Sequence, residues 1–191
     1  IKHLSFGDEA RGNVFNGIDK LYLAVSSTLG ASGKCVLLED GSGNPVITKD
    51  GVTVANAVTL IDPVENMGAT LLKQAARKTV EEAGDGTTTA TILAHSIISE
   101  AQKIQGYSER EIKAGINSAT LKVIKYLEDR AKDVSGEMLK HVATISSNND
   151  EEIGDIISSA FNASGKGGVV TMEISRDEKT SFEVINGATL D

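Results

Sequence analysis

The stretch "AGDGTTTAT", residues 83–91, contains two glycines, one aspartate and four threonines, although amphipathic sequences flank it on both sides. Gly84 and Gly86 allow the backbone to adopt a positive φ or to approach a ligand closely. Asp85 is a hard oxygen ligand that suits Mg²⁺, and the three threonines that follow begin a helix whose free N–H groups attract anions. The stretch therefore predicts a cradle for a phosphate chain and its magnesium ion.

A purely structural alternative treats the same residues as a turn between two helices, with a threonine as the N-cap. The row of three threonines favours the phosphate cradle, because β-branched threonine is a poor helix former.

Composition indicates a globular protein, with 40% hydrophobic and 24% charged residues among 191. The formal net charge of −8 and the lack of a basic stripe argue against a nucleic acid or an anionic membrane as partner. No apolar run approaches the roughly 18 residues of a membrane span. A single cysteine, Cys35, excludes an internal disulfide, so a reducing cytoplasm is the expected location. Cys35 lies in the apolar run "KCVLLED" and is expected to be a buried strand residue.

Apolar residues repeat at helical spacing through the first two-thirds of the chain. The expected helices cover about 8–29, 50–60, 62–83, 88–104, 108–132, 137–145 and 150–164. Strand-like runs are expected at 34–40 and 45–49, after the first helix, and at 169–174 and 180–187, near the end of the sequence. The helix that begins at Ser108 carries an apolar stripe of Ile112, Ile116, Leu121, Ile124 and Leu127. The sequence thus predicts a mainly α first part with a small β-hairpin, then a small α+β part.

Two further segments could approach a ligand. "STLGASGK", residues 27–34, leaves a helix through Gly30 and Gly33, so its amides could face a ligand, although a plain glycine C-cap is the better explanation of this segment taken alone. "TKDGVTV", residues 48–54, places Asp50 at a strand-to-helix junction. Asp50 is either a second carboxylate near the phosphates or the N-cap of the next helix, and this motif alone leaves both alternatives open.

In this order and at these spacings, "TLG", "TKDGVTVA", "ENMGA" and "AGDGTTTAT" resemble the N-terminal part of a group I, or bacterial-type, chaperonin subunit. The similarity runs from "FGDEAR" through "ATISSNND" and "GKGGVVTMEI", and so covers essentially the whole chain. The resemblance implies a chaperonin-like but incomplete fold. Residues 1–131 would form the N-terminal half of the equatorial ATP-binding domain, 132–186 the N-terminal half of the intermediate domain, and 187–191 the start of the apical domain.

The resemblance also implies roles for individual residues. The expected ATP-binding residues are Thr28, Leu29, Gly30, Ala31, Lys49, Asp85, Gly86, Thr87, Thr88, Thr89, Ile145 and Asn148. Asp85 would coordinate Mg²⁺, and Asp50 would lie beside the phosphates and a monovalent cation, K⁺, in a supporting catalytic role. Hinges are expected at Ser135–Gly136 and at Gly187.

The implied function is that of an ATP-driven chaperonin subunit, which assists protein folding inside the cavity of a homo-oligomeric ring. Its partners would be a co-chaperonin and unfolded client proteins, in the cytoplasm of a bacterium or of a phage-infected host. The family's water-activating aspartate lies outside these residues, so the segment alone is expected to be inactive. The alternative is a truncated or degenerate chaperonin that acts as a non-hydrolysing assembly module.

Two positions depart from the family pattern. Ala31 stands where the family usually has a proline, and Ser135–Gly136 stands where a proline is common near the lower hinge. A glycine restrains the backbone less than a proline does, so the domain swing is expected to be less restrained. These departures indicate a divergent member, and a phage origin is one hypothesis for it.

Overall fold

A computed structural model describes residues 4–30, 32–165, 167–176 and 179–187. The chain divides into two compact units, Ile1–Tyr126 and Leu127–Asp191. The predicted boundary after residue 131 lies close to this division. The assignment of the two units to equatorial and intermediate halves stays a prediction.

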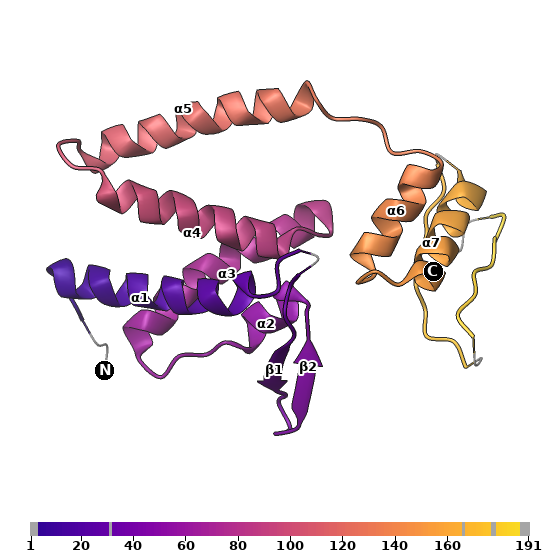
Figure 1. The fold of residues 1–191 in the computed structure, drawn as a ribbon, viewed down its shortest axis with the longest axis horizontal. Helices are drawn as coiled ribbons and strands as arrows, with labels where there is room; N and C mark the ends of the chain where they lie inside the picture. Colours follow the sequence, from indigo (N-terminus) through magenta and orange to yellow (C-terminus); the bar gives the residue numbers. More distant parts are fainter. Residues whose placement is uncertain (1–3, 31, 166, 177–178, 188–191) are drawn as a thin grey trace. The chain divides into compact units, whose positions relative to one another are not determined.

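The first unit is built from helices that the sequence predicts closely. Figure 1 shows them in chain order: α1 (Gly7–Ser26), α2 (Gly51–Ala57), α3 (Pro63–Ala83), α4 (Thr87–Lys103) and α5 (Glu109–Glu128), the last of which ends just beyond the division. Their starts follow from capping chemistry. The carboxylate of Asp62 accepts hydrogen bonds from the amides of Val64 and Glu65, and Ser108 exchanges hydrogen bonds with Glu111 in a capping box.

Between α1 and α2 lies an antiparallel hairpin of β1 (Val36–Glu39) and β2 (Pro45–Thr48), as predicted. Alternate side chains of a strand point to opposite faces, and here Val36 and Leu38 pack against the core. Cys35 and Leu37 consequently face outward. The expectation that Cys35 is buried is therefore wrong, because it precedes β1 and its thiol is exposed.

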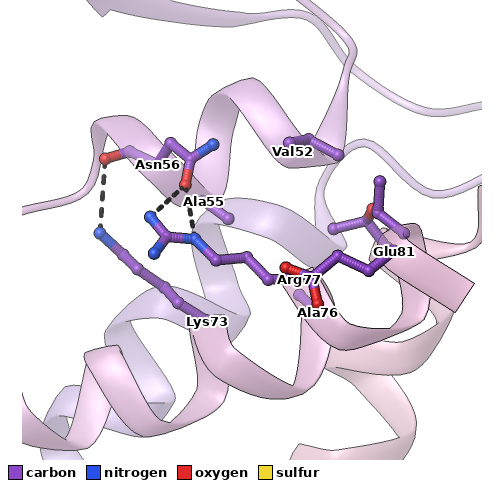
Figure 2. A pocket seen from close by; sticks show the side chains of 9 residues that line it. Val52, Ala55, Asn56, Lys73, Ala76, Arg77 and Glu81 are labelled. Atoms are coloured by element: carbon purple, nitrogen blue, oxygen red, sulfur yellow. Dashed lines mark hydrogen bonds between the residues drawn. The ribbon is translucent and has the colours of Figure 1, made fainter. Parts of the chain in front are cut away.

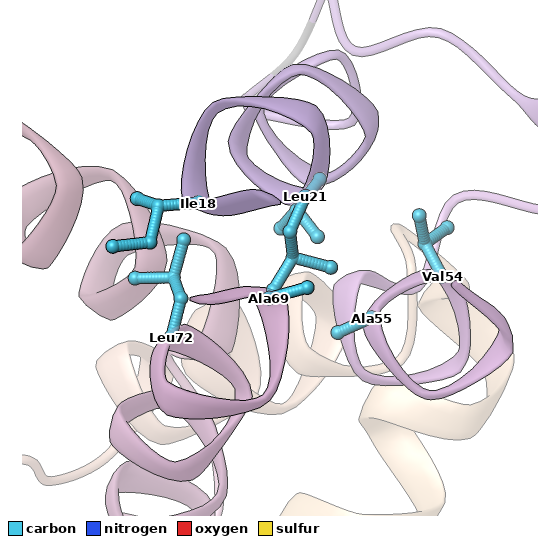
Figure 3. Packing of buried hydrophobic residues seen from close by; sticks show 7 residues of the cluster. Ile18, Leu21, Val54, Ala55, Ala69 and Leu72 are labelled. Atoms are coloured by element: carbon cyan, nitrogen blue, oxygen red, sulfur yellow. The ribbon is translucent and has the colours of Figure 1, made fainter. Parts of the chain in front are cut away.

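The core of the first unit lies where α1, α2 and α3 meet (Figure 3). Its buried side chains are Ile18, Leu21, Val25, Val54, Ala55, Ala69 and Leu72. Two glycines allow α1 and α3 to touch backbone to backbone. A Cβ atom on Gly17 would lie 1.7 Å from the carbonyl oxygen of Glu65, and one on Gly68 would lie 1.9 Å from that of Val14. The spacing of these two helices is therefore set by main-chain contact.

The apolar stripe predicted for α5 is present but is not buried. None of the side chains of α5 is buried, and Leu121, Ile124 and Leu127 are exposed. An amphipathic pattern identifies the face of a helix that can pack, and burial additionally requires a neighbouring surface.

The second unit contains α6 (Glu137–Ser146) and α7 (Glu151–Ser164), both as predicted. The two helices approach closely because Gly154 has no side chain to hold them apart. A Cβ atom there would lie 2.1 Å from Thr144 Oγ1. An ion pair of 2.6 Å between Lys140 and Asp155 also joins α6 to α7.

The strands predicted at 169–174 and 180–187 are wrong for the described part of these segments, which has no strand assignment. A strand requires a hydrogen-bonded neighbour to pair its backbone groups. Here alternating apolar side chains such as Met172 and Ile174 stay exposed. No helix in the described residues is long and apolar enough to cross a membrane.

Candidate functional site

The turn between α3 and α4 is shaped by two glycines. Helix α3 ends at Ala83, and its C-cap, Gly84, has a φ of 76° and donates its N–H to the carbonyl oxygen of Val80. Gly86, with a φ of 94°, is the N-cap of α4. Such positive φ values favour glycine strongly. Asp85 is therefore held, exposed, between two left-handed residues at the point where α4 begins.

The first turn of α4 begins with three threonines whose exposure to solvent increases along the chain. Thr87 is buried, Thr88 is partly buried and Thr89 is exposed. The buried hydroxyl of Thr91 donates to the carbonyl oxygen of Thr87 at 2.9 Å and so fixes this turn from behind. Gly86 offers no side chain to cap the helix, and the first-turn N–H groups together with the helix dipole attract an anion.

The segment "STLG" meets this turn. The Oγ1 atoms of Thr28 and Thr88 are 3.3 Å apart, although 60 positions separate the residues. Thr28 is buried, and its hydroxyl donates to the carbonyl oxygen of Val25 at 2.8 Å. Gly33 closes the loop, because a Cβ atom there would lie 2.2 Å from the carbonyl oxygen of Thr28. The end of α1 and the start of α4 thus lie side by side.

The segment "KDG" meets the same threonine from a third direction. Gly51 is buried, and a Cβ atom on it would lie 2.2 Å from Thr88 Oγ1. The three segments that the sequence singles out therefore converge on one side chain, Thr88. This convergence was not visible in any one motif.

Asp50 acts as the N-cap of α2, which is the structural alternative left open by the sequence. Its carboxylate accepts hydrogen bonds from the amide of Val52 at 3.2 Å and from the amide and hydroxyl of Thr53 at 2.8 and 2.6 Å. Burial raises the pKa of Asp50, but these three hydrogen bonds together outweigh it and lower the pKa below its usual 3.8. The carboxyl is therefore firmly ionised near neutral pH. It keeps lone pairs that could also face a cation.

The contacts made at Thr88 do not include five of the other predicted site residues. Leu29 and Lys49 are exposed, and Ala31 lies outside the described residues. Ile145 and Asn148 belong to the second unit, where Ile145 is exposed and Asn148 has a φ of 60°. The nucleotide-binding roles of all five stay predictions.

The predicted hinge residues have backbone conformations consistent with a turn. Gly136 has a φ of 57° and is the N-cap of α6, and Ser135 accepts a hydrogen bond from the amide of Met138. Gly187 has a φ of 153°. A hinge function at these positions stays a prediction.

The donor set around Asp85 suits a metal ion that arrives with a ligand. In the part of the chain that the structure describes, no three His, Cys, Asp or Glu side chains gather into a metal site. Magnesium commonly binds through one or two carboxylates plus the phosphates of a substrate. A single carboxylate beside a helix start that can attract an anion therefore fits magnesium complexed to a phosphate chain better than it fits a resident metal.

A small pocket lies between α2 and α3, beside Thr87 at the start of α4 (Figure 2). Sequence reasoning missed this pocket. Its volume is about 150 Å³, below the roughly 300 Å³ at which small-molecule sites begin. It is therefore too small for a nucleotide. The pocket is lined by Val52, Ala55, Asn56, Lys73, Ala76, Arg77, Val80, Glu81 and Thr87.

Polar contacts at the rim of this pocket join α2 to α3. Arg77 donates two hydrogen bonds to Asn56 Oδ1, at 3.3 and 2.9 Å, and Lys73 donates to the carbonyl oxygen of Val58. Burial, and then the charge of Arg77, lower the pKa of Lys73. These contacts hold α2, and with it Gly51, against α3.

Comparisons with known proteins identify the family of the chain. The profile of the TCP-1/cpn60 chaperonin family matches residues 21–191. "Heat shock protein 60" of Emericella nidulans is 46% identical over 193 residues, which cover 100% of this chain and 33% of the relative. Mitochondrial heat shock protein 60 of Ajellomyces capsulatus shows the same identity and coverage.

Solved structures give the same result. The chaperonin gp146 of bacteriophage EL 2 (Pseudomonas aeruginosa), crystallised in the presence of ATP-BeFx, has a TM-score of 0.72 and 31% identity, over 85% of this chain and 29% of that one. A group III chaperonin in the open state has a TM-score of 0.65 and 29% identity, over 80% of this chain and 31% of that one. The chain spans about a third of the length of the curated relatives. It belongs to the TCP-1/cpn60 chaperonin family.

Proposed function

We propose that the chain supplies the phosphate- and magnesium-binding part of an ATP site in a chaperonin subunit that assists protein folding. The observation that carries the proposal is the convergence of "STLG", "KDG" and "DGTTT" on Thr88, through the 3.3 Å contact with Thr28 and the bare Cα of Gly51. Family membership and the ATP analogue present with the phage chaperonin support it.

In this proposal, the residues act by position and charge. The first-turn amides of α4 and the hydroxyls of Thr87, Thr88 and Thr89 donate hydrogen bonds to the β- and γ-phosphates. Asp85 holds Mg²⁺, which neutralises charge on the transferring phosphoryl group when it is bound. Asp50 adds a second carboxylate beside the phosphates, with K⁺ as the expected monovalent cation.

The remaining parts of the proposal rest on the family. They are a homo-oligomeric ring, a co-chaperonin, unfolded client proteins, a cytoplasmic location, and hinges at Ser135–Gly136 and Gly187 that couple nucleotide binding to domain motion. By the family resemblance, the water-activating aspartate is not among these residues. We therefore expect the chain to bind Mg·ATP and to release no phosphate from it.

The test is Mg·ATP binding by Asp85→Ala, measured by isothermal titration calorimetry with and without magnesium. The variant should bind at least tenfold more weakly than the original chain in magnesium, because it loses a charged metal ligand. Asp133→Ala, which removes an exposed aspartate between α5 and α6, is the matched control and should bind like the original chain. Equal affinity for Asp85→Ala and the original chain would refute the proposed role.

The second candidate is a non-hydrolysing assembly module, and the exposed apolar side chains of α5 are the observation that favours it. It predicts that the chain forms oligomers without binding Mg·ATP. Size-exclusion chromatography with light scattering, run beside the calorimetry, distinguishes the two candidates.

A further inference from the structure

We propose that Gly51 is a positioning residue of the ATP site, whose missing side chain sets the position of the Thr88 hydroxyl. This inference rests on the proposed function and adds to it a residue that acts through the position of Thr88. Gly51 is the buried first residue of α2 and directly follows the capping carboxylate of Asp50.

Backbone conformation does not explain a glycine at this position. Gly84 and Gly86 have positive φ values, whereas Gly51 does not. A glycine without that requirement weakens a helix relative to alanine. The explanation lies in space instead, because a Cβ atom on Gly51 would lie 2.2 Å from Thr88 Oγ1 and 3.4 Å from Thr88 Cβ. Only the hydroxyl of Thr88 conflicts severely with a side chain at position 51.

That hydroxyl has a defined partner on its other side. Thr28 Oγ1 lies 3.3 Å from Thr88 Oγ1, and the single proton of the Thr28 hydroxyl is donated to the carbonyl oxygen of Val25. A hydroxyl has one proton to donate. The proton between the two threonines therefore belongs to Thr88, which can donate this one proton either to Thr28 or to a phosphate oxygen.

Gly51 and Thr28 thus confine one hydroxyl at the start of α4. An alanine at position 51 would force the Thr88 side chain to rotate, break its contact with Thr28 and move its hydroxyl away from the proposed phosphate position. Because the conflict is with the Thr88 oxygen, removing that oxygen should make the alanine harmless.

A double-mutant cycle tests this coupling. The variants are Gly51→Ala, Thr88→Ala and the combination of both, with Gly12→Ala as the matched control. Gly12 is an exposed residue of α1, and a Cβ atom there meets nothing within 4 Å. Each variant is measured by urea unfolding and by calorimetric titration with Mg·ATP.

We expect Gly51→Ala and Thr88→Ala each to weaken Mg·ATP binding by about tenfold, the effect of losing one hydrogen bond to a charged group. The combined variant should also lose about tenfold. A hundredfold loss in the combined variant, or a Gly51→Ala affinity equal to that of Gly12→Ala, would overturn the inference.

The unfolding measurements separate failure of this inference from failure of the proposed function. Gly51→Ala should lower the urea midpoint when Thr88 is present and should not lower it in the Thr88→Ala background. An equal decrease of the urea midpoint in both backgrounds would show that a side chain at position 51 does not conflict with the Thr88 hydroxyl, and would overturn the inference. A chain that shows this coupling in unfolding but binds no Mg·ATP would instead refute the proposed function, and the positioning role with it.

Discussion

Replacing Asp50 with alanine should lower the free energy of unfolding by about 1–2 kcal/mol at pH 7, the upper half of the range measured for lost N-caps. The upper half is expected because the carboxylate accepts from two backbone amides and from the hydroxyl of Thr53. Asp62 is the natural control. It caps α3 through the amides of Val64 and Glu65 at 2.8 and 2.9 Å, so Asp62→Ala should be destabilising by a similar amount.

Asp50→Asn separates capping from nucleotide binding. Asparagine generally caps a helix about as well as aspartate. Its one oxygen can still accept from the amide and hydroxyl of Thr53, whereas its NH2 group cannot accept from the amide of Val52. This variant should therefore lose about 0.5–1 kcal/mol, less than Asp50→Ala. It nevertheless removes the charge that the proposed function places beside the phosphates and K⁺. We therefore expect Asp50→Asn to weaken Mg·ATP binding and its dependence on K⁺, whereas Asp62→Asn should leave both unchanged.

The pH dependence has a definite sign. Because the pKa of Asp50 is lower in the folded chain than its usual 3.8, its stabilisation is fully present above 3.8. That stabilisation is lost as the pH falls through the lower folded value. The difference in stability between the original chain and Asp50→Ala should therefore shrink in acid.

Urea unfolding followed by far-UV circular dichroism, at pH 7 and through the range below pH 5, measures both effects. The capping argument fails if Asp50→Asn is as destabilising as Asp50→Ala, or if the difference between Asp50→Ala and the original chain does not shrink in acid. The nucleotide role fails if a stable Asp50→Asn variant binds Mg·ATP with unchanged affinity.

Three further predictions concern the first unit. Leu21→Ala, at a fully buried position between α1 and α3, should lower the free energy of unfolding by about 2–5 kcal/mol in urea titrations, and a loss under 1 kcal/mol would contradict this packing. Gly68→Ala should cost about 1–3 kcal/mol through its conflict with the Val14 carbonyl, whereas Gly12→Ala should not destabilise in the same assay. Cys35 should react with a thiol reagent in the folded chain as fast as in urea, and protection of the thiol would show that the hairpin packs differently.

The helices and the glycine turn between α3 and α4 could be predicted because their signals are local. Asp62 with Pro63 marks the start of one helix, and the Ser108 capping box marks the start of another. Each signal is formed by residues that lie within a few positions of one another in the sequence. The two glycines around Asp85 signal positive φ values in the same way, and both have them.

The features that sequence reasoning missed depend on neighbours distant in the chain. Residues 169–174 have the alternation of a strand, yet alternation does not provide the second strand that a ladder requires. Cys35 lies in an apolar run, but which alternate residues of the run are buried depends on which face of the hairpin packs against the core. The conflict between Gly51 and Thr88 involves residues 37 positions apart, and a glycine after a capping aspartate gives no signal of it.

The backbone contact of α1 with α3 has a consequence for binding entropy. Helix α1 leads directly into Thr28, and α3 leads directly into Gly84 and Asp85. Since the helices touch through Gly17 and Gly68 with no side chain between them, the separation of the two loops they carry is fixed before any ligand arrives. Ligand binding then has little backbone to order, so more of the interaction energy appears as affinity. The proposed site would then be preorganised by two glycines whose contacts lie between α1 and α3.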